Sequence, residues 1–300
     1  MTCVEPVASG RRRRLPVQDY DLALTLTSGQ AFRWRPIAAG WEGVVHHHWL
    51  RLTQAHGAIA VQTAAPLTDP AWLRTYLQTE QPLNQVLASF PNDGPLRAAC
   101  AAVRGLRLLR QDPWETLASF ILSSSKQICQ IQQIVETLCL RFGAPVAVPV
   151  GHPSAHAFPT PDRLAQASEA ELRACKMGFR APFLRETAGV VARGSLDLES
   201  LRQRDVETAR AALMELPGVG RKVADCVLLF AYGFQQAFPV DVWVTKALRH
   251  LYFPGRQVST RSLERFTQSY FGPYAGYAQQ YLFHYMRVVT RSSSPVPSPP

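Results

Sequence analysis

The segment LPGVGRKVADC, residues 216–226, combines residue types at a spacing that favours chemistry. Gly218 and Gly220 separate two stretches of helical periodicity, which predicts two helices joined by a tight turn. Lys222 falls in the first turn of the second helix, and only four of the 32 Lys and Arg residues are lysine. Lysine, unlike arginine, loses its proton readily enough to act as a nucleophile. The pattern therefore predicts amine chemistry at Lys222, with a chance placement as the alternative.

The turn before Lys222 also has the features of a phosphate-binding site. Gly218 and Gly220 allow positive φ and a close approach of the backbone, and the first amides of the next helix point at an incoming phosphate oxygen. Arg221 adds a positive charge beside the turn. Such a hairpin holds a DNA backbone without reading its sequence, and many DNA-binding proteins carry one without any catalysis.

The surroundings of Lys222 favour a neutral amine, because the positive end of the helix dipole and Arg221 both oppose a further charge. Cys226 lies one turn later on the same helix face, so amine and thiol are expected to line one wall; considered alone, Cys226 is a small core residue. Downstream, Asp241 in PVDV precedes a helical stretch and is predicted to be its N-cap. A carboxylate fixed there could stabilise a developing sugar cation or orient the amine.

Positioning these groups requires a folded frame, and the sequence predicts an α+β one. We expect a small N-terminal antiparallel sheet domain, residues 18–105, packed on a larger all-helical domain, residues 106–290. Within residues 18–65, short alternating segments separated by turn signals are typical of strands. The basic arm 1–17 and the Ser- and Pro-rich tail 291–300 are expected to be disordered.

From about residue 70 the periodicity becomes helical, and the helix starts are signalled by caps. Asp112, followed by proline, predicts one N-terminus, and the next helix is expected to end at Gly143. Ser168 and Glu171 have the spacing of a capping box. Asp205 is expected to begin the helix that leads into the glycine turn.

Composition narrows the class of partner. The 300 residues are 47% hydrophobic and carry a formal net charge of +10, which favours a polyanion, and nucleic acid before membrane because no basic amphipathic anchor is present. No membrane span or signal peptide is evident, so an intracellular protein is expected. The six cysteines lack metal-site spacing. Three adjacent histidines, 46–48, would alternate between strand faces and cannot converge on one ion, so no metal is expected.

Seven blocks in register resemble the 8-oxoguanine DNA glycosylase/AP lyase family of the helix-hairpin-helix glycosylase superfamily, in its eukaryotic-type branch with its bacterial members. The blocks are SGQAFRW (28–34), RLLRQDPWETLASFILSS (107–124), FPTPDRLA (158–165), MGFRAPF (177–183), LPGVGRKVADCVLLFA (216–231), PVDV (239–242) and YAQQYLF (277–283). A hairpin lysine with a downstream VDV is specific to bifunctional members of this superfamily. The resemblance covers roughly residues 18–287.

This resemblance implies the reaction and its catalytic residues. The enzyme would flip the oxidised base out of duplex DNA, with Lys222 as the nucleophile on C1′ of the sugar. A Schiff base would form, followed by strand cleavage through β-elimination, and Asp241 would stabilise the oxocarbenium-like transition state. The resemblance implies double-stranded DNA containing oxidised guanine as partner, a monomeric enzyme, and no metal or organic cofactor.

The same resemblance implies how the base would be recognised. The backbone carbonyl of Gly29 would accept a hydrogen bond from the N7–H that oxidised guanine has, whereas guanine would present a repulsive lone pair. Phe283 would stack on the base with Cys226 on its other face, and Gln279 would bond the Watson–Crick edge. Taken singly, Phe283 would more commonly be a core residue and Gln279 a surface one.

The duplex itself would be held by Phe179, a wedge in the vacated stack, and by Arg180, a reader of the orphaned cytosine. Two departures from the family concern the opposite base: Ser125 stands where relatives with strong cytosine preference carry asparagine, and Gln130 where they carry arginine. We therefore expect weaker cytosine selectivity. Trp243 replaces a histidine found in many relatives, which leaves the phosphate contacts there open.

Two other functions remain open from the residues themselves. One is a catalytically silent DNA-binding module that uses the hairpin only to hold the backbone; Lys222 together with Asp241 argues against it. The other is a monofunctional alkyl-base glycosylase of the same fold, a class that lacks the hairpin lysine. The cysteines of the iron–sulphur glycosylases are absent from the C-terminal region.

Overall fold

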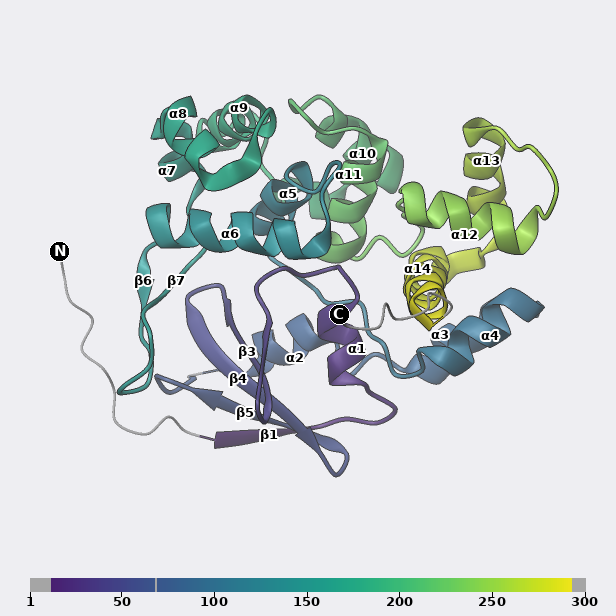
Figure 1. Cartoon of the computed structure of the whole chain (residues 1–300), viewed down its shortest axis with the longest axis horizontal. Helices are drawn as coiled ribbons and strands as arrows, with labels where there is room; N and C mark the ends of the chain where they lie inside the picture. Colours follow the sequence, from purple (N-terminus) through teal and green to yellow (C-terminus); the bar gives the residue numbers. More distant parts are fainter. Residues whose placement is uncertain (1–11, 68, 293–300) are drawn as a thin grey trace, which may run out of the picture.

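An antiparallel sheet of five strands forms the N-terminal part of the protein (Figure 1). The computed structural model describes residues 12–67 and 69–292. In space the strands follow the order β1-β5-β4-β3-β2. They are β1 (Arg12–Pro16), β2 (Arg35–Ile37), β3 (Gly40–Val45), β4 (His48–Ala55) and β5 (Ala58–Thr63). Tight turns join β3 to β4 and β4 to β5, where Val45 pairs with His48 and Ala55 with Ala58.

The first strand corrects the expectation that residues 1–17 are disordered. Residues 12–16 form β1 and pair with β5, with Leu15 opposite Ile59. Leu15 is buried in the sheet core, and this single apolar anchor is hidden in the sequence by the neighbouring arginines. Residues 1–11 of the expected arm lie outside the described residues, as do residues 293–300 of the expected tail.

Strands were predicted within residues 18–65, but the segment that contains ALTLTSG begins with a short helix, α1 (Leu22–Thr27). Asp21 caps it by accepting a hydrogen bond from the Leu24 amide at 2.8 Å, and Leu22 and Leu26 bury one face at a spacing of four. The alternation of Leu and Thr suggested a strand, but the Asp21 cap favours a helical turn. Within that turn the Thr25 hydroxyl donates back to the Asp21 carbonyl.

The remainder of the chain is mainly helical. Its elements are α2 (Ala71–Leu77), α3 (Leu83–Ala88), α4 (Gly94–Ala102), α5 (Pro113–Ile121), α6 (Ile128–Phe142), β6 (Pro145–Val146), β7 (Ala155–His156), α7 (Pro161–Gln166), α8 (Glu169–Leu172), η1 (Arg173–Met177), α9 (Arg180–Ala192), η2 (Glu199–Gln203), α10 (Val206–Met214), α11 (Arg221–Val227), η3 (Leu228–Tyr232), α12 (Val242–Tyr252), α13 (Thr260–Tyr270), η4 (Gly272–Tyr274) and α14 (Ala275–Ser292). Strands β6 and β7 pair with each other. The fold is therefore α+β, as predicted.

The cap residues predicted from the sequence are confirmed. Asp112 accepts from the Glu115 amide at the start of α5, Ser168 and Glu171 form a capping box at α8, and Asp205 caps α10. Helix α6 ends at Phe142 with Gly143 as its C-cap. Helix α5 is buried on nearly all sides rather than on one face, which places it at the centre of the helical part.

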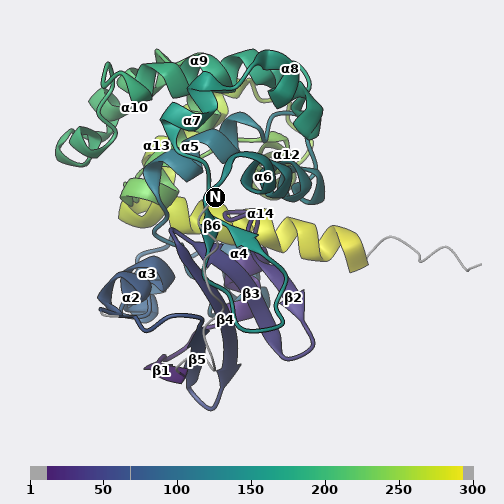
Figure 2. The ribbon, with the colours of Figure 1, turned by 90° about the vertical axis from the view of Figure 1, so that its left-hand side faces the viewer.

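Two large hydrophobic cores and a smaller third one organise the part of the chain that the structure describes. The sheet, α1 and α2 enclose one core, whereas α3 and α4 join the larger core of the helical part and α4 packs against α14. The predicted domain boundary lies between residues 105 and 106. It assigns α3 and α4 to the N-terminal domain, although both pack against the helical part. Figures 1 and 2 show α5 to α13 above the sheet and α14 between α12 and α4, whereas α1 to α4 lie at the level of the sheet.

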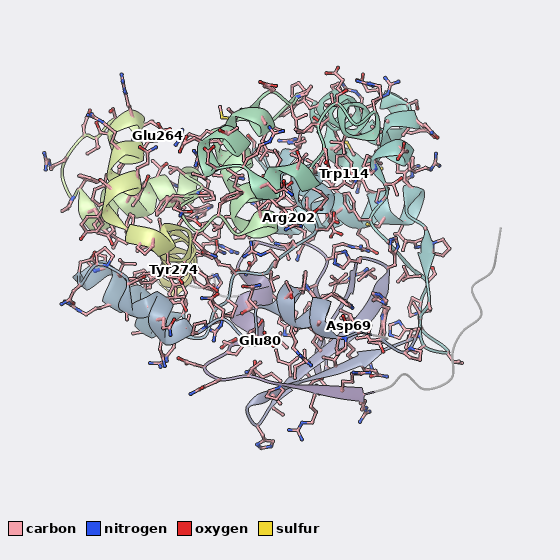
Figure 3. All side chains as sticks on the ribbon, turned by 180° about the vertical axis from the view of Figure 1, so that it is seen from behind. Asp69, Glu80, Trp114, Arg202, Glu264 and Tyr274 are labelled. Atoms are coloured by element: carbon pink, nitrogen blue, oxygen red, sulfur yellow. The ribbon has the colours of Figure 1, made fainter. Side chains whose placement is uncertain are left out.

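Side chains fill the space between these parts. In the rear view, Trp114 lies in the helical part and Asp69 in the sheet part (Figure 3). The indole of Trp114 donates to the Pro159 carbonyl at 2.9 Å. None of the helices in the described part of the chain combines the length and apolar character that a membrane crossing requires.

Candidate active site

The hairpin between α10 and α11 is fixed by packing on its inner side. Gly218 has φ of +76°, and a Cβ built there would lie 2.8 Å from the Cβ of Phe183, so only glycine suits this position. The Pro217 carbonyl accepts a hydrogen bond from the Thr187 hydroxyl at 3.0 Å. These contacts hold the turn against α9.

Gly220, unlike Gly218, does not adopt a positive φ. Its φ is −92°, in the extended region that any residue adopts, and it serves as the N-cap of α11 without a side-chain hydrogen bond. Apart from its two chain neighbours, no described residue has an atom within 4 Å of a Cβ built there. Gly220 thus does not use the positive φ that glycine allows, and the absence of a side chain leaves the outer face of the turn open to an approaching backbone.

A buried ion pair anchors α11 beneath the hairpin. The Arg210 guanidinium of α10 lies 2.7 Å from Asp225 of α11, and both side chains are almost fully buried. The other carboxylate oxygen of Asp225 lies 3.9 Å from Nε of Arg221. Removing one partner from such a pair would leave an uncompensated buried charge. Arg221 is therefore held beside the turn, and α11 keeps its direction relative to α10.

Lys222 projects from the second position of α11 towards α5. Its Nζ donates to the hydroxyl of Ser123 at 2.9 Å and lies 5.2 Å from the ring centroid of Phe120. Among the ion pairs of residues 12–67 and 69–292, none involves Lys222. The amine is half-buried and is not paired with a carboxylate, so a substrate atom would not have to displace a counter-ion to reach it.

Asp241 begins α12 as its N-cap, as predicted. One carboxylate oxygen accepts from the Val244 amide at 2.7 Å, which fixes the orientation of the carboxylate. Asp241 and Lys222 both line a cavity of about 690 Å³. The structure therefore brings the amine and the carboxylate to the same space from two different helices.

That cavity also contains four of the residues assigned to base recognition: Gly29, Cys226, Gln279 and Phe283. Its volume is within the usual range for small-ligand pockets. The walls come from the loop after α1 and from α5, α6, α11, α12 and α14. The cavity is thus assembled where the sheet part meets the helical part.

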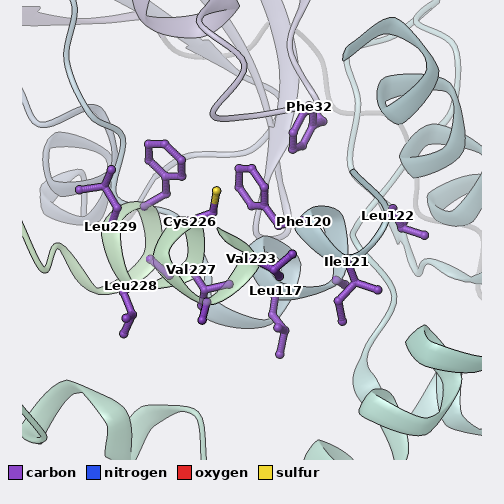
Figure 4. Close-up of a cluster of buried hydrophobic side chains, with 14 of the residues drawn as sticks. Phe32, Leu117, Phe120, Ile121, Leu122, Val223, Cys226, Val227, Leu228 and Leu229 are labelled. Carbon is purple, nitrogen blue, oxygen red and sulfur yellow. The ribbon is translucent and has the colours of Figure 1, made fainter. Parts of the chain in front are cut away.

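Cys226 forms an apolar wall of the cavity. Figure 4 shows its sulfur beside Phe120, on the side of α5 and α11 that faces Phe32, whereas Leu117 and Val227 point away from it. Burial raises the pKa of the Cys226 thiol to about 12, with the nearby Lys222 acting in the opposite direction. The thiol is therefore protonated at neutral pH and serves as a surface for contact, not as a nucleophile.

Helix α14 contributes Gln279 and Phe283, which share one face at a spacing of four. Gln279 is 4% exposed, and within the described part of the chain its side-chain oxygen has no hydrogen-bond partner. A buried polar atom without a partner is costly unless a ligand supplies one. The guanidinium of Arg287 lies 5.4 Å from the Phe283 ring centroid and so supports the ring from one side.

The turn at Gly29 is built to stay in place. Its φ is +84°, and a Cβ there would lie 2.7 Å from Cδ1 of Ile128 and 3.4 Å from the Phe283 ring. The preceding carbonyl, of Ser28, accepts from the buried amide of Gln280 at 2.9 Å. The carbonyl of Gln30 accepts from Gln111 at 2.7 Å. These two bonds fix the backbone on both sides of Gly29, next to Phe283.

The three residues assigned to the duplex lie outside the cavity. Phe179 is 57% exposed at the start of α9. Arg180 is buried, and its guanidinium donates to the carbonyls of Met177, at 3.2 Å, and of Ser124. Ser125 is exposed and has a φ of +54°. Arg180 thus ties down the loop that carries Ser123 and Ser125, and its Nε is buried without a hydrogen-bond partner among the described residues.

The sequence did not predict several lining residues. Lys126 lines the same cavity as Lys222, so the cavity contains a second amine. Ser123 and Phe120, which contact Lys222, were likewise not assigned a role. All three belong to the end of α5 and the loop after it. The sequence feature that could have pointed to them is the run SSSK, residues 123–126, directly after a predicted helix.

Two family models match the chain. Residues 13–117 match the 8-oxoguanine DNA glycosylase N-terminal domain, and residues 118–273 match the HhH-GPD superfamily of base excision DNA repair proteins. The chain belongs to the 8-oxoguanine DNA glycosylase family. The family's N-terminal model ends inside α5, so the central helix is shared between the two matched regions.

Individual members of this family align over most of the chain. A probable N-glycosylase/DNA lyase of Methanothermobacter thermautotrophicus is 30% identical, over 91% of this chain and 96% of its own. The solved structure of MBOgg1 in complex with a low-affinity DNA ligand superposes with a TM-score of 0.89 at 31% identity, over 95% and 99% of the two chains. A Clostridium acetobutylicum 8-oxoguanine glycosylase/lyase, solved with double-stranded DNA containing cytosine opposite 8-oxoguanine, gives a TM-score of 0.86 at 27% identity, over 95% and 100%.

Proposed function

We propose that this protein removes 8-oxoguanine from duplex DNA and then cleaves the strand as an AP lyase. The observation that carries the proposal is the 690 Å³ cavity, in which Lys222 and Asp241 lie with an aromatic ring, a thiol wall and an unpartnered buried amide oxygen. The names of the aligned family members, which include lyases, support the same reaction. We further infer that the enzyme acts as a monomer inside the cell, where its DNA substrate lies.

The chemistry follows from the positions of the two catalytic groups. The unprotonated Nζ of Lys222 attacks C1′ as the bond from C1′ to the base nitrogen breaks and the base leaves with that electron pair. Asp241, held by its cap bond, stabilises the positive charge that develops on the sugar. Loss of a proton from the nitrogen and opening of the sugar ring give the Schiff base. Removal of a C2′ proton then expels the 3′ phosphate.

Recognition of the base requires that it leave the helix, because its glycosidic bond is not accessible in the stack. Phe283 and Cys226 would contact the two faces of the flipped base, and the Gln279 side chain would bond its Watson–Crick edge. The fixed carbonyl of Gly29 would accept the N7–H of the oxidised base. Guanine presents an acceptor at that position, so the same carbonyl would repel it.

Gly218, Gly220 and Arg221 would hold the DNA backbone outside the cavity. The open space over Gly220 and the free amides at the start of α11 suit a phosphate oxygen. Phe179 would enter the stack that the base vacates. Arg180 would read the orphaned cytosine and also hold the loop of Ser125, because a guanidinium has more N–H donors than the two carbonyl bonds require.

Reductive trapping tests the proposed function directly. We expect a covalent protein–DNA complex when the protein and an 8-oxoguanine duplex are incubated with borohydride, which reduces the Schiff base. A duplex with guanine in place of the lesion is the matched control and should give no complex. Tight binding of the lesion duplex without a trapped complex would favour the silent DNA-binding alternative, and base release without trapping would favour a monofunctional glycosylase.

Ser125→Asn is expected to sharpen selectivity for cytosine opposite the lesion. Asparagine tolerates the positive φ of this position and offers a donor and an acceptor where serine offers a hydroxyl. One added bidentate contact corresponds to about tenfold in discrimination. Excision rates measured opposite each of the four bases would show the change. Ser124→Asn, at the adjacent exposed position, is the control and should leave the ranking as it is.

A further inference from the structure

A second hollow, of about 800 Å³, runs along α12 and the loop after it. Its lining comes from α12, from residues 253–257 and from α14. The lining residues are Lys246, Arg249, His250, Leu251, Phe253, Pro254, Gly255, Arg256, Gln257, Tyr285 and Met286. Three permanent cations and a histidine thus share this groove, and no carboxylate lines it. We call it the α12 groove.

The cations of the α12 groove have no carboxylate partner in the part of the chain that the structure describes. In the ranges 12–67 and 69–292, no salt bridge involves Lys246, Arg249, His250 or Arg256. Arg249 donates to the carbonyl of Val258 at 3.2 Å, which holds the loop over the helix end. Lys246, His250 and Arg256 are exposed. Charges gathered in a hollow without counter-ions favour an anionic ligand.

Stabilisation of the helix end explains only part of this cluster. Arg249 and His250 lie in the last turn of α12, where positive charge complements the helix dipole. Lys246 lies in the middle of α12, too far from its C-terminus for that effect. Arg256 follows the helix in the loop. The positions of Lys246 and Arg256 therefore call for another explanation.

The α12 groove lies next to the active-site cavity along α12. Trp243 lines the cavity, and Nζ of Lys246, which lines the groove, lies 5.2 Å from the Trp243 ring centroid. Helix α12 begins at the Asp241 cap, and it rises about 1.5 Å per residue. Lys246 and His250 therefore lie roughly 7 and 13 Å along the axis from the catalytic carboxylate, or about two to four nucleotide steps of a DNA strand.

We propose that the α12 groove binds phosphates of the duplex two to four nucleotides away from the lesion. The inference rests on the proposed function, because it takes the lesion to lie in the cavity beside Asp241. Lys246 and Arg256 supply the phosphate contacts, and Trp243 lies between them and the reacting sugar. The groove thus lengthens the protein's hold on one flank of the damaged site without reading its sequence.

The salt dependence of DNA binding tests this proposal. The probe is a duplex carrying a tetrahydrofuran abasic analogue, which the enzyme cannot process, and the measurement is the slope of log Kd against log salt concentration. Each phosphate contact contributes about 0.9 to that slope. We expect Lys246→Gln/Arg256→Gln to lower the slope by about 1.8. Arg12→Gln/Arg14→Gln removes the same charge from exposed positions on β1, at the far side of the sheet (Figures 1 and 2), and should leave the slope unchanged.

The position of the analogue within the duplex provides a second arm. With the analogue near one end, the flank that reaches the α12 groove is missing, and the parent and the groove variant should then have equal slopes. With the analogue near the other end, the difference should persist. An unchanged slope in the groove variant, or an equal loss in both double variants, would overturn the proposal. Excision of 8-oxoguanine by the unaltered protein reports separately on the proposed function.

Discussion

Lys222→Gln is expected to abolish the borohydride-trapped complex and to lower the rate of 8-oxoguanine excision by more than about a thousandfold. The reason is that glutamine has no amine to form a Schiff base, while its side chain can still bond the hydroxyl of Ser123, which lies 2.9 Å from the lysine nitrogen. The measurement is single-turnover excision together with trapping on a denaturing gel. Binding of the lesion duplex should persist, because the backbone contacts of the hairpin do not depend on the amine.

Lys126→Gln is the matched control for that experiment, since Lys126 is the second lysine of the same cavity. It receives the same substitution and should keep the trapped complex. If instead the complex survives in Lys222→Gln and disappears in Lys126→Gln, the nucleophile is the loop lysine and the proposed role of the hairpin lysine is wrong. In either case the double variant Lys222→Gln/Lys126→Gln should give no trapped complex, because neither amine remains in the cavity.

The residues of the hairpin could be placed from the sequence because short-range effects decide their geometry. Gly218 needs its positive φ for a tight turn, and Asp241 begins a helix by bonding an amide three residues later. These constraints act within a few residues and leave a sequence signal. Gly220 shows the limit of this reasoning: glycine in a turn suggests a positive φ, but here it serves as an N-cap in extended geometry.

Residues that depend on packing between distant segments could not be placed in this way. Lys126 and Arg180 owe their positions to the loop after α5, which α9 and α11 hold from two sides through Arg180 and Lys222. Nothing local in SSSK fixes where that loop lies. The resemblance to the family supplied a role for Arg180, yet the burial of its guanidinium becomes visible only when α9 packs against the loop.

The fold itself was predictable in class and in its helix caps, but less so in the N-terminal part. In α1, alternating Leu and Thr favoured a strand until the Asp21 cap decided for a helix. In β1, three arginines hid one buried leucine that pairs across from β5. In α1 a local cap outweighs the composition of the segment, whereas in β1 the tertiary partner does.

Asp241→Asn is expected to lower the rate of excision by about a hundred- to a thousandfold. Asparagine removes the negative charge that would stabilise the sugar cation. It is nevertheless among the best N-cap residues. It can therefore keep the hydrogen bond from the Val244 amide, which is 2.7 Å long in the parent protein. The thermal midpoint should therefore stay close to that of the parent protein, and the loss should be in the chemical step at saturating enzyme, not in DNA binding.

Asp241→Ala separates the two roles of this carboxylate. It removes both the charge and the cap, so the rate should fall as in Asp241→Asn while the folded state loses a further ~1 kcal/mol from the uncapped helix. If the asparagine variant keeps the parental rate and only the alanine variant is slow, Asp241 acts through the position of α12 alone. The reverse, two equally slow variants of unequal stability, would mean that the carboxylate charge itself acts on the reacting sugar.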